Sequence, residues 1–294
     1  MAKKKTKHYP VVRKAPVSSG SAANTLVDTG RFLSVLNRRL YRMGRNYEVK
    51  VDLRNDFPAQ VEVYALRDDW VVQKAYQMAY QAYLDNTMEE REGATGTNVA
   101  RWEDFRVQSG LTLGLNTGLP VLHTSSGGST PQNEGEFTNS HVVDDANVQR
   151  TFTWGTPGAT QFGILTEYDK AGNAQGNPST PSNTAPYSGI DGEHNDQTAQ
   201  DLANDNNQPP YDRDGINADT PWVRVAVLGA TAGTQKLSSG YFCAPCGFVL
   251  LKGYSESSEA YSASLEVKAG DYKGVHAPSM IEVATVNRKR KVVK

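Results

Sequence analysis

The chain contains little cysteine and no long apolar run, and both shortages restrict its class. Its 294 residues include two cysteines, Cys243 and Cys246, too few for a disulfide framework and only half of a structural zinc site. Their Cys-Ala-Pro-Cys spacing would suit a redox pair, but it lies in a turn between two strand-like segments rather than before a helix. No run approaches the roughly 18 apolar residues that span a bilayer. The cationic N-terminus lacks the apolar region of a secretory signal. We therefore expect structural cysteines, no membrane insertion and a cytoplasmic or nuclear site of synthesis.

Catalytic motifs are also missing. There is no Gly-x-x-x-x-Gly-Lys-Ser/Thr phosphate loop, no Gly-x-Ser-x-Gly elbow and no His-Glu-x-x-His zinc helix. The five histidines are scattered without metal-ligand spacing. The segment around Asp212 fails as a calcium loop because Pro210 and Pro221 occupy ligand positions, which leaves open only calcium held between acidic loops of neighbouring subunits. We expect no enzyme, no cofactor and no metal site within the chain.

What the sequence does contain is segregated charge. Residues 1–50 hold twelve Lys and Arg against two acidic residues, and residues 288–294 add five basic residues and no acid, although the formal net charge is −1. Cationic ends on an anionic body indicate a polyanion partner, bound through nonspecific phosphate contacts with release of counterions. The same basic runs would also serve nuclear import. The candidate nucleic-acid-binding residues are Lys3, Lys4, Lys5, Lys7, Arg13, Lys14, Arg31, Arg38, Arg39, Arg42, Arg45, Arg288, Lys289, Arg290 and Lys291.

Composition divides the chain into one domain and two tails. Residues 1–30 have few large apolar groups and predict a disordered basic arm, residues 31–287 a single domain, and residues 288–294 a basic tail. Residues 169–221 are rich in Asn, Asp, Gly and Pro and predict a long acidic surface loop. We expect the basic ends and the arginines of residues 31–45 to share one side of the domain, opposite this loop.

Periodicity predicts a mostly β domain. Residues 47–53 and 61–66 alternate apolar and polar side chains, as half-buried strands do. Residues 70–84 follow Asp68 and Asp69 and repeat apolar residues at helical spacing, which predicts the one strong helix. A short helical stretch is expected around 88–92 and 98–105. Further strands are expected at 120–123, 149–154, 161–166, 222–228, 240–251, 260–267 and 281–286. About eight strands without a βαβ rhythm favour an antiparallel all-β sandwich.

This layout resembles a single jelly-roll viral coat protein. The segments Tyr64-Ala-Leu-Arg-Asp-Asp-Trp70 and Arg101-Trp-Glu-Asp-Phe-Arg-Val107, on either side of the predicted helix, are similar to capsid proteins of small circular Rep-encoding single-stranded DNA (CRESS) viruses. The arm is less Arg-dense than in circoviruses, and a second basic run stands at the C-terminus, which leaves open which end contacts the genome.

The resemblance implies an eight-stranded antiparallel jelly roll with one helix inserted between early strands and long surface loops. It further implies that many copies form an icosahedral shell around the viral genome, expected to be single-stranded DNA, with the acidic loops outside. The protein would then be found in the virion and, during assembly, in the host nucleus or cytoplasm. The host receptor is left open.

Two other classes of protein fit parts of the pattern. Tyrosine, tryptophan and Asn/Asp-rich loops suit a β-sandwich that binds carbohydrate, including a phage tail or fibre attachment protein. A nucleic-acid enzyme with an unrecognised, metal-dependent site is the second alternative. Particles seen by electron microscopy, binding to a glycan array and nuclease activity distinguish the three classes.

Overall fold

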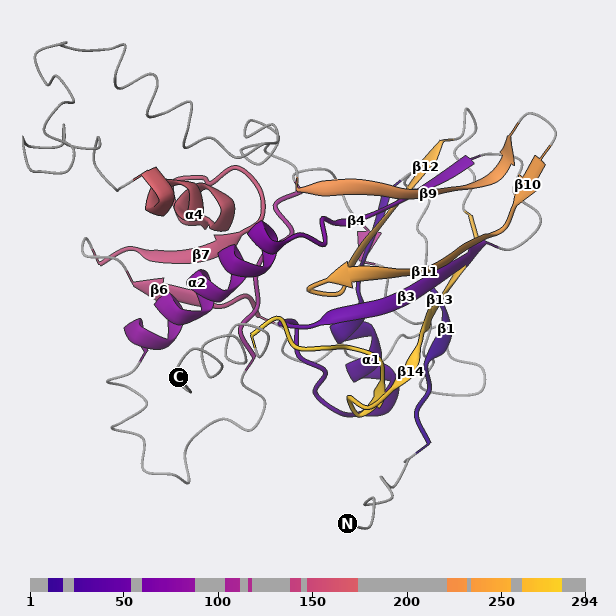
Figure 1. Cartoon of the computed structure of the whole chain (residues 1–294), viewed down its shortest axis with the longest axis horizontal. Helices are drawn as coiled ribbons and strands as arrows, with labels where there is room; N and C mark the ends of the chain where they lie inside the picture. Colours follow the sequence, from indigo (N-terminus) through magenta and orange to yellow (C-terminus); the bar gives the residue numbers. More distant parts are fainter. Residues whose placement is uncertain are drawn as a thin grey trace, which may run out of the picture.

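A computed structural model shows a mostly β protein (Figure 1). The structure describes residues 10–17, 24–53, 60–87, 104–111, 116–117, 138–143, 147–173, 221–231, 234–254 and 261–281.

One main sheet has four strands, all antiparallel, in the order β1-β13-β3-β11. The strands are β1 (Lys14–Val17), β3 (Asn46–Leu53), β11 (Ser238–Pro245) and β13 (Ala263–Val267). Along β3, Tyr47, Val49 and Val51 are buried while the residues between them are only partly buried. The period-two pattern therefore gives this sheet one face in the core and one toward solvent.

The second main sheet has the order β10-β9-β4-β12-β2-β5. Its strands are β2 (Asn24–Asp28), β4 (Gln60–Leu66), β5 (Asn116–Thr117), β9 (Trp222–Thr231), β10 (Thr234–Lys236) and β12 (Phe248–Tyr254). All neighbours are antiparallel except the short β2–β5 pair. The β4–β9 register shifts between Val63 and Tyr64, so β9 carries a bulge.

The two sheets share one hydrophobic core, as in a β-sandwich. Val49 and Leu265 of the four-stranded sheet are buried in the same cluster as Val63, Leu228 and Leu251 of the six-stranded sheet. Burying both apolar faces against each other removes them from water, which is the main favourable term for such a fold.

A second layer packs beside the sandwich and has its own core (Figure 1). It consists of helices α2 (Trp70–Asn86) and α4 (Ile164–Asn173) and a small sheet of β6 (His141–Val143), β7 (Gln149–Thr153) and β8 (Gln161–Gly163). Tyr76 of α2 stacks with Trp154 and meets Phe105 edge-on, so aromatic rings fill this core. The apolar stripe predicted on this helix therefore packs against protein.

Several expected elements are confirmed. The strands at 47–53, 61–66, 149–154 and 222–228 and the helix after Asp69 are present, and the Asp69 carboxylate accepts a 2.9 Å hydrogen bond from Val72 N as its N-cap. The region 240–251 holds β11 and β12, joined by a turn in which Cys246 and Gly247 have positive φ. The strand expected at 260–267 begins at Ala263.

Other expectations are wrong. Two helices of the described residues were not expected, because α1 (Thr29–Asn37) follows β2 and α4 replaces the second half of the strand expected at 161–166. Strands β1 and β2 lie within residues 1–30, where a disordered arm was expected, because each pairs with a buried partner strand. Residues 104 and 105 are in neither a helix nor a strand.

The remaining expectations fall largely on residues that the structure does not describe. These are the helical stretch at 88–92, most of 98–105, the strand at 120–123, all but the first residue of 281–286, most of the acidic loop at 169–221 and the tail at 288–294. Residues 169–173 belong to α4, so the predicted loop starts later than expected.

Candidate nucleic-acid interface

Four cations gather at one end of the sandwich. After α1, which ends at Arg38 in a left-handed conformation, the chain carries Arg39, Arg42 and Arg45 toward β3. Lys273 joins them from the turn between β14 (Ala269–Gly270) and β15 (Gly274–Val275). Burial, and then the charges of these three arginines, lower the pKa of Lys273. We call Arg39, Arg42, Arg45 and Lys273 the basic cluster.

Two tyrosines form the frame of the basic cluster. Tyr272 presents its ring to Arg45, whose Cζ lies 3.4 Å from the ring centroid, and Tyr41 meets Tyr272 edge-on. Arg45 also donates a 2.8 Å hydrogen bond to Ala277 O. Arg45 is therefore held in a fixed orientation, as a stacked guanidinium is in nucleic-acid sites.

The backbone next to Arg42 is also fixed, while its side chain is exposed. Arg42 N donates to Tyr272 Oη at 3.2 Å, and Tyr41 Oη donates to Lys273 O at 3.0 Å. These bonds tie the Arg39–Arg45 segment to the β14–β15 hairpin. The side chains of Arg42 and Lys273 reach solvent from this tied frame.

Both described ends of the chain lie next to the basic cluster. On the N-terminal side, Val12 exchanges two backbone hydrogen bonds, of 2.8 and 2.9 Å, with the Asn37 side chain at the end of α1. Val11 packs so closely on Gly274 that a Cβ there would lie 2.7 Å from Val11 Cγ2. On the C-terminal side, Met280 N donates to Gly44 O at 3.1 Å. The sequences before Pro10 and after Ile281, which carry the terminal lysines and arginines, thus attach beside the cluster.

The structure separates Lys14 from the basic cluster. Lys14 lies on the outer face of the four-stranded sheet, 2.7 Å from Asp52 and 3.4 Å from Glu266. Lys50 pairs with the same two carboxylates, and the hydrogen bond to Asp52 raises the pKa of Lys14. This face therefore mixes both charges, and the cations gather at the end of the sandwich rather than across one side as expected.

The other predicted residues have mixed outcomes. Arg13 adjoins β1, Arg31 lies in α1 and Arg38 caps it. Arg39, Arg42 and Arg45 come together as expected. Lys3, Lys4, Lys5, Lys7, Arg288, Lys289, Arg290 and Lys291 lie outside the described residues. Sequence reasoning missed Lys273 and the two tyrosines because their hydrogen bonds join residues about 230 positions apart.

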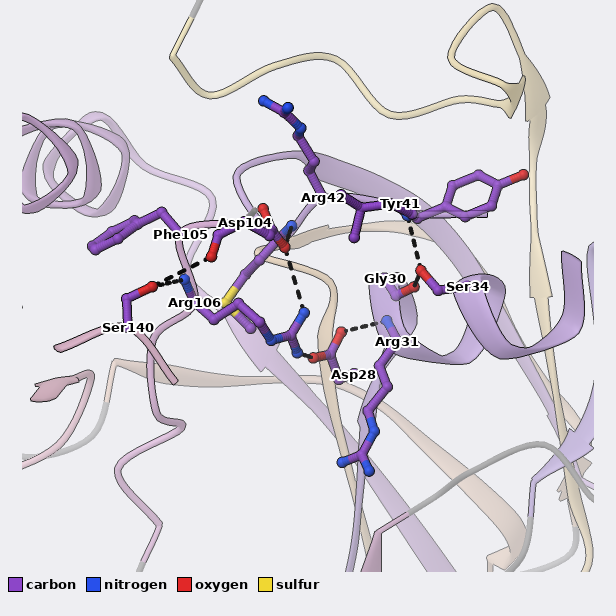
Figure 2. A network of polar contacts seen from close by, with 12 residues as sticks. Asp28, Gly30, Arg31, Ser34, Tyr41, Arg42, Asp104, Phe105, Arg106 and Ser140 are labelled. Carbon is purple, nitrogen blue, oxygen red and sulfur yellow. Dashed lines mark hydrogen bonds and ion pairs between the residues drawn. The ribbon is translucent and has the colours of Figure 1, made fainter. Parts of the chain in front are cut away.

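A buried ionic network of Asp28, Asp104 and Arg106 lies near Arg42 of the basic cluster, whose side chain points away from it (Figure 2). Arg106 pairs with Asp28 through one guanidinium nitrogen and lies 3.5 Å from Asp104 through the other. Asp28 also caps α1 by accepting from Arg31 N, and Asp104 accepts from Met43 N at 3.0 Å. The three side chains are at most 11% exposed. Two carboxylates on one guanidinium leave the group one negative charge in excess when both are ionised.

This network joins the second layer to the sandwich. Ser140 Oγ accepts from Arg106 N at 2.9 Å, and Tyr76 Oη donates to Phe105 O at 3.0 Å, so these residues are held by the residue that precedes β6 and by α2. Burial raises the pKa of Asp104 to about 6, against the opposing effects of Arg106 and the bond from Met43. Asp104 therefore titrates near neutrality, unlike an exposed aspartate.

The cysteines have a different environment. Both are free thiols, and burial is the main cause that raises the pKa of Cys243 and of Cys246 well above that of an exposed thiol. Reactive cysteines have the opposite shift, because the thiolate is the nucleophile. Neither Cys243, in β11, nor Cys246, in the turn that follows it, has the environment of a reactive thiol.

The fold and the cluster define a class: a mostly β protein of stacked antiparallel sheets with a cationic end. Comparisons with protein-family models, with curated proteins and with solved structures find no match to this chain. Within the described ranges, no three His, Cys, Asp or Glu side chains gather as metal ligands, and no helix is long and apolar enough to span a membrane.

Proposed function

We propose that the protein is a viral capsid protein. Its copies assemble into an icosahedral shell and package nucleic acid, single-stranded DNA by resemblance, through the basic cluster and the basic termini. The proposal has two parts, a jelly-roll fold for the main sheets and nonspecific phosphate binding at their cationic end. The main observation in support of the proposal is that both described ends of the chain lie beside the basic cluster.

The pairing of the strands supports the jelly roll. Eight main strands, in chain order, are β1, β2, β3, β4, β9, β11, β12 and β13. The first pairs with the eighth, the second with the seventh, the third with the sixth and the fourth with the fifth. This is the pairing of one long hairpin rolled into two sheets, which is how a jelly roll contains two Greek keys.

Phosphate binding is supported by charge and geometry together. An arm of nine residues with four lysines precedes Pro10, and a tail with five cations follows Ile281. Both join the folded chain beside Arg42, Arg45 and Lys273. Cations that converge from several segments neutralise phosphates without reading bases, which suits packaging of any sequence.

Electron microscopy of the purified chain tests the proposal. We expect closed particles with icosahedral symmetry, and a ratio of absorbance at 260 nm to that at 280 nm that reports nucleic acid inside. Exchanging Lys3, Lys4, Lys5 and Lys7 for glutamine should lower that ratio, because four phosphate-neutralising charges are lost. A chain that stays monomeric under every assembly condition would contradict the proposal, and an unchanged ratio would exclude the arm as a packaging element.

One observation favours a second candidate function, carbohydrate binding. Trp70 is 51% exposed at the start of α2, with Tyr168 edge-on 6.4 Å away and Lys74 near its ring. Exposed aromatic rings of this kind stack on the apolar faces of sugars. Binding to a glycan array by a chain that forms no particles would favour this candidate over the capsid.

A further inference from the structure

Asp104 is hydrogen-bonded to the backbone segment that carries Arg42 of the basic cluster. Asp104 Oδ2 accepts from the N–H of Met43, the residue that follows Arg42. Figure 2 shows the Arg42 side chain pointing away from the buried network while Asp104 lies on the other side of that backbone. A ligand bound by Arg42 would thus face Asp104 across a single layer of chain.

We propose that binding of single-stranded nucleic acid to the basic cluster is coupled to the uptake of a proton by Asp104, so that mildly acidic pH strengthens binding. The inference rests on the proposed function, since it assigns a regulation to the same site.

The coupling follows from the charges that face Asp104. On its own segment it faces Arg106, which also holds Asp28 of β2. From the basic cluster, Arg42 and Lys273 attract the Asp104 carboxylate. The other titratable groups in electrostatic contact with it are Tyr47 of β3, Tyr76 of α2 and Cys246 of the β11–β12 turn, all of which are neutral near pH 7.

A bound phosphate changes this balance in one direction. It competes with Asp104 for the positive charge of Arg42 and Lys273, and it adds negative charge in front of a carboxylate that burial already disfavours. Both effects favour protonated Asp104 in the complex. Because its pKa is already raised to about 6, the proton is taken up close to neutral pH.

The sign of the pH dependence is fixed by linkage. If the complex holds more protons than the free protein, affinity rises as pH falls through the higher pKa of the complex toward the lower pKa of the free protein. A coupling that raises the pKa of Asp104 by about 0.5 to 1 unit gives about a threefold to tenfold gain in affinity.

The test compares two full-length proteins, the natural chain and Asp104→Asn. The asparagine side-chain oxygen can still accept from Met43 N, but it cannot titrate. Fluorescence anisotropy with a labelled oligothymidine would give the dissociation constant at pH 5.5 and 7.5 and constant ionic strength. The five histidines are common to both proteins, so their titration cancels. Between these two pH values the natural chain should gain roughly twofold to sixfold more affinity than Asp104→Asn, most of the full effect.

Calorimetry supplies a second readout. In two buffers with different enthalpies of ionisation, binding at pH 6.5 should show net proton uptake by the natural chain and less uptake by Asp104→Asn. Asp104→Ser, which also accepts from a backbone N–H, replaces the asparagine variant if that variant does not fold. Equal pH dependence in the natural and variant proteins would overturn the coupling while leaving the capsid function intact. Failure of the natural chain to bind the oligonucleotide at any pH would overturn both.

Discussion

Exchange of Arg106 for methionine is expected to destabilise the folded subunit by roughly 3–5 kcal/mol at pH 7, the range typical of a buried charge that loses its partner. The guanidinium is 8% exposed and is shared by Asp28 and Asp104. Methionine fills similar volume but leaves two carboxylates facing each other without a cation. Asp28 would still accept its hydrogen bond from Arg31 N and cap α1. The expected loss of stability therefore comes from the uncompensated carboxylate charges.

The same exchange should show a characteristic pH dependence. Without the guanidinium, protonation relieves the repulsion between the carboxylates, and protonation is more favourable in the folded than in the unfolded chain. A group of this kind stabilises the fold at low pH and loses that contribution as pH rises through its folded pKa. The destabilisation by Arg106→Met should therefore be smaller at pH 5 than at pH 7.

Urea unfolding of dissociated subunits at both pH values measures these effects. Lys268→Met is the matched control, because Lys268 pairs with Glu48 at 2.6 Å on the exposed face of the four-stranded sheet. Exposed pairs of this kind contribute about 0–1 kcal/mol. A loss for Arg106→Met no larger than that of the control would show that the buried network does not hold the second layer to the sandwich.

The sequence was sufficient for the strands whose surroundings are local. In β3, buried and partly buried residues alternate without interruption, and in α2 the Asp69 cap precedes a regular apolar stripe. Helix α1 also has an aspartate cap, Asp28, but it begins at Thr29 and Gly30, which are poor helix formers and are buried against Tyr41 and Gly247 from other segments. Helix α4 begins one residue after β8, where a strand-like apolar run gives no break.

The residues of the candidate site also fall into two groups, those that the sequence alone identifies and those whose place depends on the fold. Charge counting identified Arg39, Arg42 and Arg45, which are close in sequence. It also included Lys14, whose neutralisation by Asp52 depends on the pairing of β1 with β13 and of β13 with β3. Lys273 could not be found, because its place beside Arg42 depends on the β14–β15 hairpin reaching the end of α1. A count of charged residues therefore predicts the sign of a surface only when the residues that form ion pairs in the fold are left out of the count.

If the position of a cation matters as well as its charge, substitutions in the basic cluster should have the second large effect, a loss of affinity for nucleic acid. Arg42→Gln/Lys273→Gln removes two exposed cations from the basic cluster. If each contacts one phosphate, the plot of log affinity against log salt for single strands should become less steep by about 1.4, since each contact contributes about 0.7. We expect affinity for an oligothymidine to fall at least about tenfold at low salt. The fold should be retained, because both residues lie at the surface and the one printed side-chain hydrogen bond lost, from Lys273 Nζ to Leu40 O, is exposed.

The matched control is Lys14→Gln/Lys268→Gln, which removes the same charge from the outer face of the four-stranded sheet. Both lysines are exposed and paired with carboxylates, at 2.7 Å to Asp52 and 2.6 Å to Glu48. If nucleic acid binds at the converging cations, the control should change the salt slope by well under half as much. Equal slopes for the two double variants would mean that binding follows total charge rather than position. The basic cluster would then lose its role, although the termini could still package the genome.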